Sequence, residues 1–230
     1  MTEAAPRFDA VCFDCDSTLS RIEGIDELAA RAGVEDLIAP LTSAAMDGSI
    51  PLDAVYGKRL DIVRPDAAAL SWLGARYIAD IVPGALDAVR ELQANDGAVY
   101  IVSGGLRGCI LPLVDALGLD ADSVHAVDVF FDRDGRYRDF DQASPLTRPD
   151  GKARVCGRLL ERHRGVALVG DGVTDVTADA AGIFVVGFGG VVAGDGLQRG
   201  ERQRVGRDEA ACGEDEGGHV AQDREATNAQ

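Results

Sequence analysis

The sequence has little of what marks membrane or nucleic-acid-binding proteins. Its longest weakly polar stretch, residues 183–194, is interrupted by glycine and is shorter than the roughly 18 residues that a membrane span needs. Basic residues number 23 against 39 acidic ones, which gives a net charge of −16. Because such a surface repels phosphate backbones and anionic lipids, we expect neither nucleic acid nor a membrane as a partner. Residues 1–7 contain an acidic residue and no apolar run follows them, so we expect a cytoplasmic protein.

Cysteine and histidine are also scarce. Five cysteines, an odd number at irregular spacing, indicate reduced thiols and no disulfide framework. Cys12 and Cys15 are spaced as C-x-x-C, but we expect them in a strand, where residues three apart point to opposite faces. The three histidines lie far apart in the sequence, so histidine-based metal or triad chemistry is not expected.

Lysine is the rarest of the charged residues. Of 23 basic residues only Lys58 and Lys152 are lysines. In a chain that uses arginine almost everywhere, a lysine indicates a position where arginine would not serve.

A composition of 46% hydrophobic and 27% charged residues is that of a globular chain with a sizeable core. Apolar runs that predict buried strands alternate with segments of helical periodicity. We expect strands at 8–13, 98–102, 166–169 and 183–186, and helices at 83–93, 106–117, 152–163 and 176–181. This alternation predicts an α/β fold, a Rossmann-like parallel sheet with helices on both faces.

Residues 25–77 interrupt this alternation with helical periodicity only, and Gly33, Pro40, Pro51 and Pro65 are the expected breaks. We therefore predict a small helical cap domain inserted after the first strand. The predicted division is a core of residues 1–20 and 83–193, a cap of residues 21–82 and a tail of residues 194–230.

The tail has three large aliphatic residues in 37 and no apolar period, so we predict that it is disordered. Strand 183–186 would then be an uncovered apolar edge. The change in character near residue 193 is abrupt enough to suggest a frame slip in the coding sequence or an error in the assigned reading frame. Elsewhere, residues 132–135 resemble the start of a calcium loop, but the later ligands are missing, so we predict a hairpin turn between strands 124–131 and 136–140.

Polar residues follow the predicted strands at the ends where a parallel sheet places its reactive groups. Each has an ordinary explanation alone: a helix cap, a glycine-rich turn or a solvated lysine. Together they predict one site, because converging carboxylates require a divalent cation and hard oxygen ligands select Mg²⁺. A phosphate ester would complete the coordination. The residues concerned are Asp14, Asp16, Ser103, Lys152, Asp171 and Asp175.

These motifs resemble those of the haloacid dehalogenase superfamily over residues 8–192. Within it, the chain is most similar to the enzymes that hydrolyse O-phosphoserine, although Leu52 stands where an aromatic residue is expected. The matching segments are FDCDSTL at 13–19, EGIDEL at 23–28, MDG at 46–48, KRL at 58–60, VSGG at 102–105, GK at 151–152, GDGVTD at 170–175 and GFGG at 187–190.

The resemblance implies a phosphatase that acts through an aspartyl phosphate, with Asp14 as the nucleophile. Asp16 would protonate the leaving alkoxide and later deprotonate water, helped by acidic neighbours that raise its pKa. Mg²⁺ would be held by the carboxylates of Asp14 and Asp171 and by the backbone carbonyl of Asp16. Asp175 would orient a water on the metal from outside this ligand set.

The resemblance also implies the substrate contacts. Ser103, Gly104 and Lys152 would bind the phosphate oxygens, and Thr174 would add a hydrogen bond. Glu23 and Arg59 would bind the ammonium and the carboxylate of a serine phosphate.

Two other readings remain open. The same core motifs fit a phosphotransferase or a phosphatase for another small phosphate monoester. A further hypothesis, outside the enzymes, is a catalytically silent acidic binding protein. The sequence predicts no oligomeric state.

Overall fold

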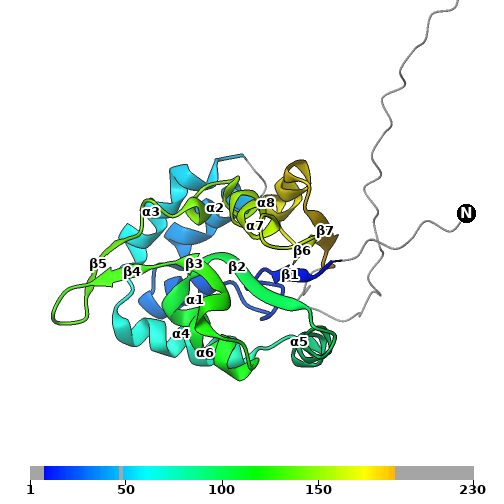
Figure 1. Cartoon of the computed structure of the whole chain (residues 1–230). Coiled ribbons are helices and arrows are strands. Elements are labelled where there is room, and N and C mark those ends of the chain that lie inside the picture. Colours follow the sequence, from blue (N-terminus) through cyan, green and yellow to red (C-terminus); the bar gives the residue numbers. More distant parts are fainter. Residues whose placement is uncertain (1–7, 47–48, 190–230) are drawn as a thin grey trace, which may run out of the picture.

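The computed structural model describes residues 8–46 and 49–189, which form a five-stranded sheet, a two-stranded hairpin and the helices around them (Figure 1). The order of the sheet is β3-β2-β1-β6-β7, and every pairing in it is parallel. The strands are β1 (Ala10–Phe13), β2 (Ala98–Leu106), β3 (Val124–Val127), β6 (Val166–Gly170) and β7 (Phe184–Gly187).

β1 occupies the centre of the sheet, although it is the first strand in the chain. Ala10 is in register with Ala98 of β2 and with Val166 of β6. Since the three strands run in the same direction, their carboxyl ends meet at one edge of the sheet. The residues that follow these strands are therefore brought together.

Helices cover both faces of the sheet, as Figure 1 shows, with α7 and α8 on one side and α5 and α6 on the other. Leu168 of β6 and Ile101 of β2 are fully buried under these layers. The connecting elements are α5 (Ala85–Ala94), α6 (Arg107–Ala116), α7 (Gly151–Leu160), α8 (Val173–Val176) and the 3₁₀ turn η3 (Thr177–Ala181). This arrangement confirms the predicted α/β fold class.

The segment between β1 and α5 is helical, as predicted. α1 ends at Gly33, whose φ of 69° is a left-handed conformation that glycine adopts without strain. α4 begins after Asp66, whose carboxylate accepts the N–H of Ala69 at 2.7 Å. The helices are α1 (Gly24–Ala32), α2 (Glu35–Met46), α3 (Leu52–Val63) and α4 (Ala67–Ala79).

The two ends of this helical insert meet. Ser20 and Ile81 form an antiparallel bridge. On either side of it, the N–H of Arg21 donates to the Asp80 carbonyl and the N–H of Val82 donates to the Leu19 carbonyl, each at 2.9 Å. The chain therefore enters and leaves the insert at one place.

Pro40 does not interrupt the helix there, contrary to the prediction, because it lies inside α2. Because proline has no backbone N–H, position 40 cannot donate a hydrogen bond to the carbonyl of Asp36 in the first turn. The helix continues beyond this missing hydrogen bond. Pro51 caps the start of α3 and Pro65 follows its last residues, so these two breaks are confirmed.

The predicted strand 124–131 is in fact two strands. β3 joins the large sheet, whereas β4 (Val129–Phe131) pairs antiparallel with β5 (Tyr137–Phe140) in a separate hairpin. The predicted turn is confirmed, because one oxygen of Asp132 accepts the backbone N–H groups of Asp134 and Arg136, both at 2.9 Å. That carboxylate orders the turn, as in an Asx turn.

β7 forms the last strand of the sheet in the part of the chain that the structure describes. Phe184 and Val186 are 42% and 39% exposed, in keeping with an apolar edge. The predicted disordered tail, residues 194–230, lies outside the described residues. None of the helices within residues 8–46 and 49–189 has the length and apolar character to cross a bilayer.

The described cysteines are free and buried, and they pack in the core. Cys12 of β1 faces Cys156 of α7, and this neighbour together with burial raises the pKa of the Cys12 thiol. Cys15 follows the strand and is completely buried, and burial also raises the pKa of its thiol. Neutral buried thiols act as small apolar side chains, and both cysteines belong to the hydrophobic core.

Candidate active site

Asp14 is the first residue after β1, and its backbone continues the sheet. Its N–H donates to the carbonyl of Val169 in β6 at 2.9 Å. The side chain is buried, its Oδ1 accepts the N–H of Cys15 at 2.7 Å and its Oδ2 accepts from Lys152 Nζ at 2.6 Å. These contacts hold a buried carboxylate in one orientation.

Lys152 lies in the first turn of α7, with its ammonium between two carboxylates. Nζ is 2.6 Å from Asp14 Oδ2 and 2.7 Å from Asp175 Oδ1. Burial opposes its charge, but the two carboxylates outweigh it and raise the pKa of Lys152 above its ordinary value. A compact ammonium fits between the two acids, which explains why this position has lysine and not arginine.

Two glycines bring the elements of the site close together. A Cβ on Gly151 would overlap the carbonyl of Pro145, so glycine lets the start of α7 approach that segment. A Cβ on Gly170 would overlap the carboxyl group of Asp175. Asp175, only 1% exposed, also accepts the N–H of Gly172 at 3.0 Å.

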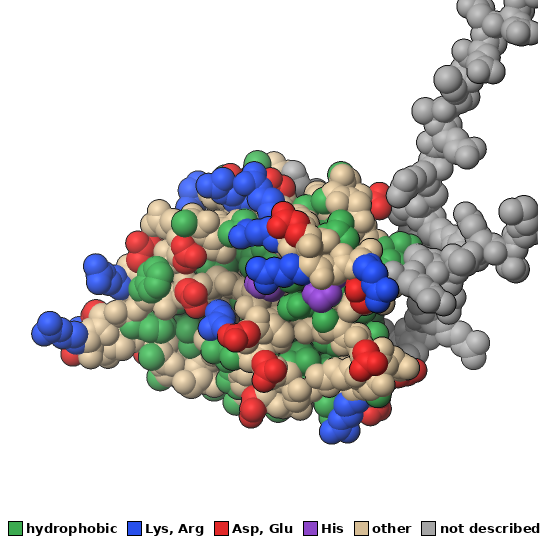
Figure 2. Space-filling view, viewed as in Figure 1, with side chains coloured by type: hydrophobic (Ala, Val, Ile, Leu, Met, Phe, Trp, Pro, Cys, Tyr) green, Lys and Arg blue, Asp and Glu red, His purple; other side chains and the backbone are tan. Residues whose placement is uncertain are grey.

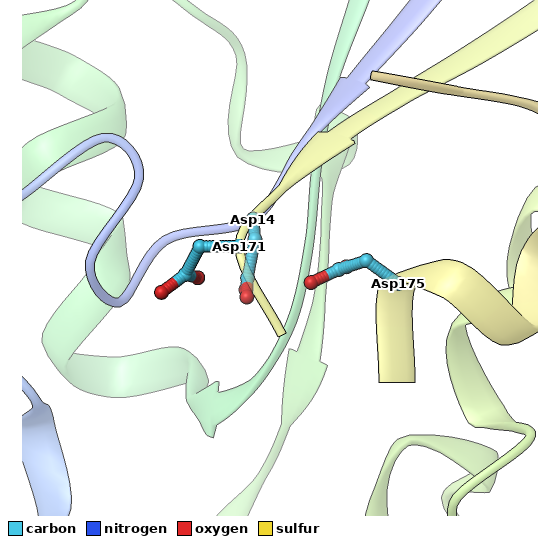
Figure 3. Close-up of side chains that lie close together, drawn as sticks. All are labelled: Asp14, Asp171 and Asp175. Atoms are coloured by element: carbon cyan, nitrogen blue, oxygen red, sulfur yellow. The ribbon is translucent and has the colours of Figure 1, made fainter. Parts of the chain in front are cut away.

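Three carboxylates lie close together at this edge of the sheet, as Figure 3 shows. Asp14, Asp171 and Asp175 each offer an oxygen, and these oxygens all lie within 4.8 Å of one another. Burial and the charge of Asp14 raise the pKa of Asp171. One ammonium offsets only part of three negative charges, and hard oxygen donors suit a small divalent cation. The cluster thus fits a metal ion.

This cluster differs in membership from the predicted ligand set. Asp14 and Asp171 belong to both, but the structure brings the Asp175 carboxylate as close as theirs. Thr18, which was not predicted, donates to Asp171 Oδ1 at 3.4 Å.

Asp16 lies two residues beyond Asp14, on the side of the helical insert. Its Oδ1 accepts the hydroxyl of Tyr77 at 2.6 Å and the N–H of Gly24 at 2.9 Å. Burial, followed by the charge of Asp14, raises the pKa of Asp16 to about 6. The predicted direction is confirmed, although burial contributes more than the acidic neighbours.

Ser103 and Gly104 lie in β2, near its carboxyl end. Ser103 is 1% exposed, and its Oγ accepts the N–H of Gly105 at 3.0 Å. The carbonyl of Gly104 accepts the hydroxyl of Tyr56 in α3 at 2.8 Å. This hydrogen bond connects the helical insert to the sheet.

A cavity of about 250 Å³ lies between the helical insert and the carboxyl ends of the strands. Nearly all of the predicted site residues line this cavity. The exception is Asp175, which does not line it but accepts a hydrogen bond from Lys152. The predicted residues that line the cavity are Asp14, Asp16, Glu23, Arg59, Ser103, Gly104, Lys152, Asp171 and Thr174.

Glu23 and Arg59 bring an acid and a base to the insert side of this cavity. Ser17 Oγ donates to Glu23 Oε1 at 2.6 Å, and burial together with the charge of Asp16 raises the pKa of Glu23 to about 8. Arg59 is buried over the ring of Tyr56, at 5.9 Å from the ring centroid. Its Nε has no acceptor among the described residues. A buried, unpaired donor beside a cavity suits an anionic ligand group.

Tyr56 and Tyr77 also line the cavity, and the sequence motifs did not reveal them. Both lie on apolar faces of helices, where an aromatic residue reads as core. Only the structure identifies these two tyrosines, because it shows that both rings are buried and that both hydroxyls reach polar atoms of the site.

Comparison with known proteins agrees with this geometry. The model of a hydrolase family, the haloacid dehalogenase-like hydrolases, matches residues 8–181. The chain is 37% identical over 186 residues to the phosphoserine phosphatase of Homo sapiens, a match that covers 80% of this chain and 83% of that protein. It is 35% identical to the chloroplastic phosphoserine phosphatase of Arabidopsis thaliana, over 76% of this chain and 60% of that one.

A solved structure of similar fold is a phospho-aspartyl intermediate analogue of phosphoserine phosphatase. It superposes with a TM-score of 0.66 at 26% identity, covering 79% of this chain and 87% of the other. The sequence motifs, the fold and the family match therefore agree over residues 8–181. The chain belongs to the family of haloacid dehalogenase-like hydrolases.

Proposed function

We propose that the protein is a magnesium-dependent phosphatase that hydrolyses O-phospho-L-serine to L-serine and phosphate. The observation that carries the proposal is that one cavity joins the Asp14 carboxylate to both Glu23 and Arg59. A serine phosphate presents a phosphate, an ammonium and a carboxylate, and this cavity offers a partner for each. The phosphoserine phosphatases among the relatives support the same substrate.

The reaction proceeds in two displacements. A carboxylate oxygen of Asp14 attacks phosphorus, and the bond from phosphorus to the serine oxygen breaks while Asp16 gives that oxygen a proton. Water then attacks phosphorus of the aspartyl phosphate, and Asp16 takes a proton from the water. The bond from phosphorus to the Asp14 oxygen breaks, which releases phosphate and regenerates the Asp14 carboxylate. The raised pKa of Asp16, about 6, suits a group that must both give and accept a proton near neutral pH.

The remaining polar groups bind the phosphate. The hydroxyl of Ser103, the backbone of Gly104 and the ammonium of Lys152 surround the phosphate oxygens, and Thr174 adds a hydrogen bond. Asp14 and Asp171, together with the backbone carbonyl of Asp16, would hold Mg²⁺. Asp175 accepts a hydrogen bond from Lys152 and would orient a water on the metal. The bound cation would offset the repulsion between the Asp14 carboxylate and the phosphate dianion.

Specificity comes from the helical insert. Arg59 binds the substrate carboxylate with its planar guanidinium, and its unpaired Nε supports this role. Glu23 binds the ammonium. We propose that the helical insert, predicted at residues 21–82, acts as a cap domain over the core, whose described part comprises residues 8–20 and 83–189. The free thiols of the buried cysteines suit the reducing cytosol, where we expect the reaction to take place.

The test is release of inorganic phosphate from a panel of phosphate monoesters, with Mg²⁺ and with EDTA. We expect phosphoserine to have the highest kcat/KM and EDTA to abolish turnover. Hydrolysis of another monoester in preference to phosphoserine would refute the substrate. Loss of substrate without equal phosphate release, in the presence of an acceptor alcohol, would identify a phosphotransferase. No turnover of any ester would support the silent binding protein.

A further inference from the structure

One oxygen of the Asp16 carboxylate is held by two donors from the helical insert. The hydroxyl of Tyr77 donates to Oδ1 at 2.6 Å, and the backbone N–H of Gly24 donates to the same oxygen at 2.9 Å. Gly24 is the first residue of α1, whereas Tyr77 lies near the end of α4. Two helices of the insert therefore converge on a single oxygen atom.

Close packing around Tyr77 fixes the position of its hydroxyl. The side chain is completely buried. A Cβ on Gly24 would overlap the Tyr77 hydroxyl, so any larger residue at position 24 would push that hydroxyl away from Asp16. The glycine thus has a steric role besides the hydrogen bond from its N–H.

Tyr77 is also fixed to the segment that carries Asp16. The carbonyl of Tyr77 accepts the hydroxyl of Ser20 at 3.2 Å, close to the bridge between Ser20 and Ile81. Since Ser20 follows Asp16 by four residues, the tyrosine and the carboxylate are anchored to the same stretch of chain. Movement elsewhere in the insert need not separate them.

The other oxygen of Asp16, Oδ2, lies toward β2, the strand that carries Ser103. A Cβ on Gly105 would lie 3.3 Å from Asp16 Oδ2 and 3.2 Å from Ser103 Oγ. Among the described residues no donor contacts Oδ2. This oxygen is therefore the one available to a ligand in the cavity.

We propose that Tyr77 is a positioning residue for the proton transfer, which it promotes by fixing Asp16 through Oδ1 so that Oδ2 faces the leaving oxygen. This inference rests on the proposed function. When the bond from phosphorus to the ester oxygen breaks, the proton on Oδ2 moves to that oxygen, and Asp16 becomes a carboxylate whose Oδ1 still accepts from Tyr77 and Gly24. The later proton from water returns to Oδ2.

The inference is tested with Tyr77→Phe and esters that differ in their need for a proton. Phenyl phosphate and p-nitrophenyl phosphate are similar in shape, but p-nitrophenolate leaves readily without protonation. The measured quantity is kcat/KM, which reports the steps up to departure of the leaving group. We expect roughly a tenfold to hundredfold loss for phenyl phosphate and phosphoserine and little change for p-nitrophenyl phosphate.

Two further variants separate positioning from a structural role. Tyr100→Phe removes a hydroxyl that contacts His163 Nε2 at 2.9 Å. Tyr100 does not line the cavity, so we expect this control to leave kcat/KM unchanged with every ester. Gly24→Ala keeps the N–H but displaces the Tyr77 hydroxyl, so it should reproduce the leaving-group dependence of Tyr77→Phe. Combining the two should cost no more than either one alone.

An equal loss of kcat/KM on both aryl esters, or no loss on either, would overturn the inference. If wild-type protein cleaves the aryl esters but not phosphoserine, the proposed substrate fails while the test of Tyr77 still stands. Thermal unfolding of each variant shows whether it is folded.

Discussion

The ammonium of Lys152 lies 2.6 Å from Asp14 Oδ2, although the two residues are 138 positions apart in the sequence. The parallel sheet makes this contact possible, since β1 and the start of α7 meet at the same edge. The same ammonium also contacts Asp175, so one cation links two acids that would otherwise repel each other. The predictions below test what this arrangement does.

Asp14→Asn should abolish phosphoserine turnover, because the amide has the shape of the carboxylate but cannot attack phosphorus. We expect less than a few per cent of the wild-type rate of phosphate release, with the thermal unfolding transition retained. Mass spectrometry must exclude deamidation back to aspartate. A variant that keeps most of the activity would rule out the aspartyl-phosphate mechanism.

Lys152→Met should destabilise the metal-free protein by about 3 kcal/mol, the usual cost of removing one partner of a buried ion pair. The reason is that Asp14 and Asp175 would then be buried without their shared cation. Urea unfolding measures this free energy. Lys58→Met, at an exposed position, is the matched control and should change it little. Equal effects of the two substitutions would contradict the structural role of Lys152.

Mg²⁺ should stabilise the wild-type protein by binding the folded state. At a concentration about 100 times the dissociation constant, the gain is about 2.7 kcal/mol. Asp171→Asn should weaken the effect, because it removes one charged ligand from the cluster. Thermal unfolding against Mg²⁺ concentration checks this without any substrate. If Asp171→Asn responds like wild type, the metal binds elsewhere.

Arg59→Ala should lower kcat/KM for phosphoserine. The expected loss of transition-state stabilisation is about 2–4 kcal/mol, the range for removing one side of a desolvated charge pair. It should have little effect on p-nitrophenyl phosphate, which has no carboxylate. The neighbouring exposed Lys58→Ala is the control and should leave both substrates unaffected. Equal losses on both esters would show that Arg59 supports the fold or the phosphate site.

Glu23 should make both stability and binding depend on pH. Burial and the charge of Asp16 raise the pKa of Glu23 from 4.5 to about 8. Between these values the folded protein keeps a proton that the unfolded chain releases, so this group lowers the free energy of unfolding as pH rises through that window. Glu23→Gln removes the effect, and its stability relative to wild type should therefore increase from pH 5 to pH 8.

Binding should show the opposite trend, because only the carboxylate form of Glu23 pairs well with an ammonium. We expect the KM of wild type for phosphoserine to fall as pH rises toward 8, and that of Glu23→Gln to lack this fall. Glu35→Gln, on the exposed side of α2, is the control. Parallel pH profiles for wild type and Glu23→Gln would exclude this role.

The sequence predicts much of the sheet and many of the polar residues around the cavity, because both follow from local rules. Apolar runs mark the strands, and parallel strands bring the residues after them to one edge. Asp14, Lys152 and Asp171 could be assigned to one site for this reason. Their proximity follows from topology and requires no knowledge of side-chain packing.

Contacts between distant helices could not be predicted in this way. Tyr77 and Tyr56 look like core residues, since nothing in a helical period tells which aromatic hydroxyl reaches a polar atom. The break between β3 and β4 also escaped prediction, because an unbroken run of strand-forming residues does not reveal where a chain leaves one sheet for another. Pro40 failed as a break because helix packing outweighs the loss of one hydrogen bond.

The bridge between Ser20 and Ile81 has a consequence for how such a chain can diversify. Because the inserted helices begin and end side by side, a segment of different length or shape can replace them without changing the order of the strands. Selection can therefore act on the choice of substrate in one stretch of the gene while the residues that handle phosphate stay constant in another. A graft of a relative's segment between positions 20 and 81 is the natural way to redirect this scaffold to a new ester.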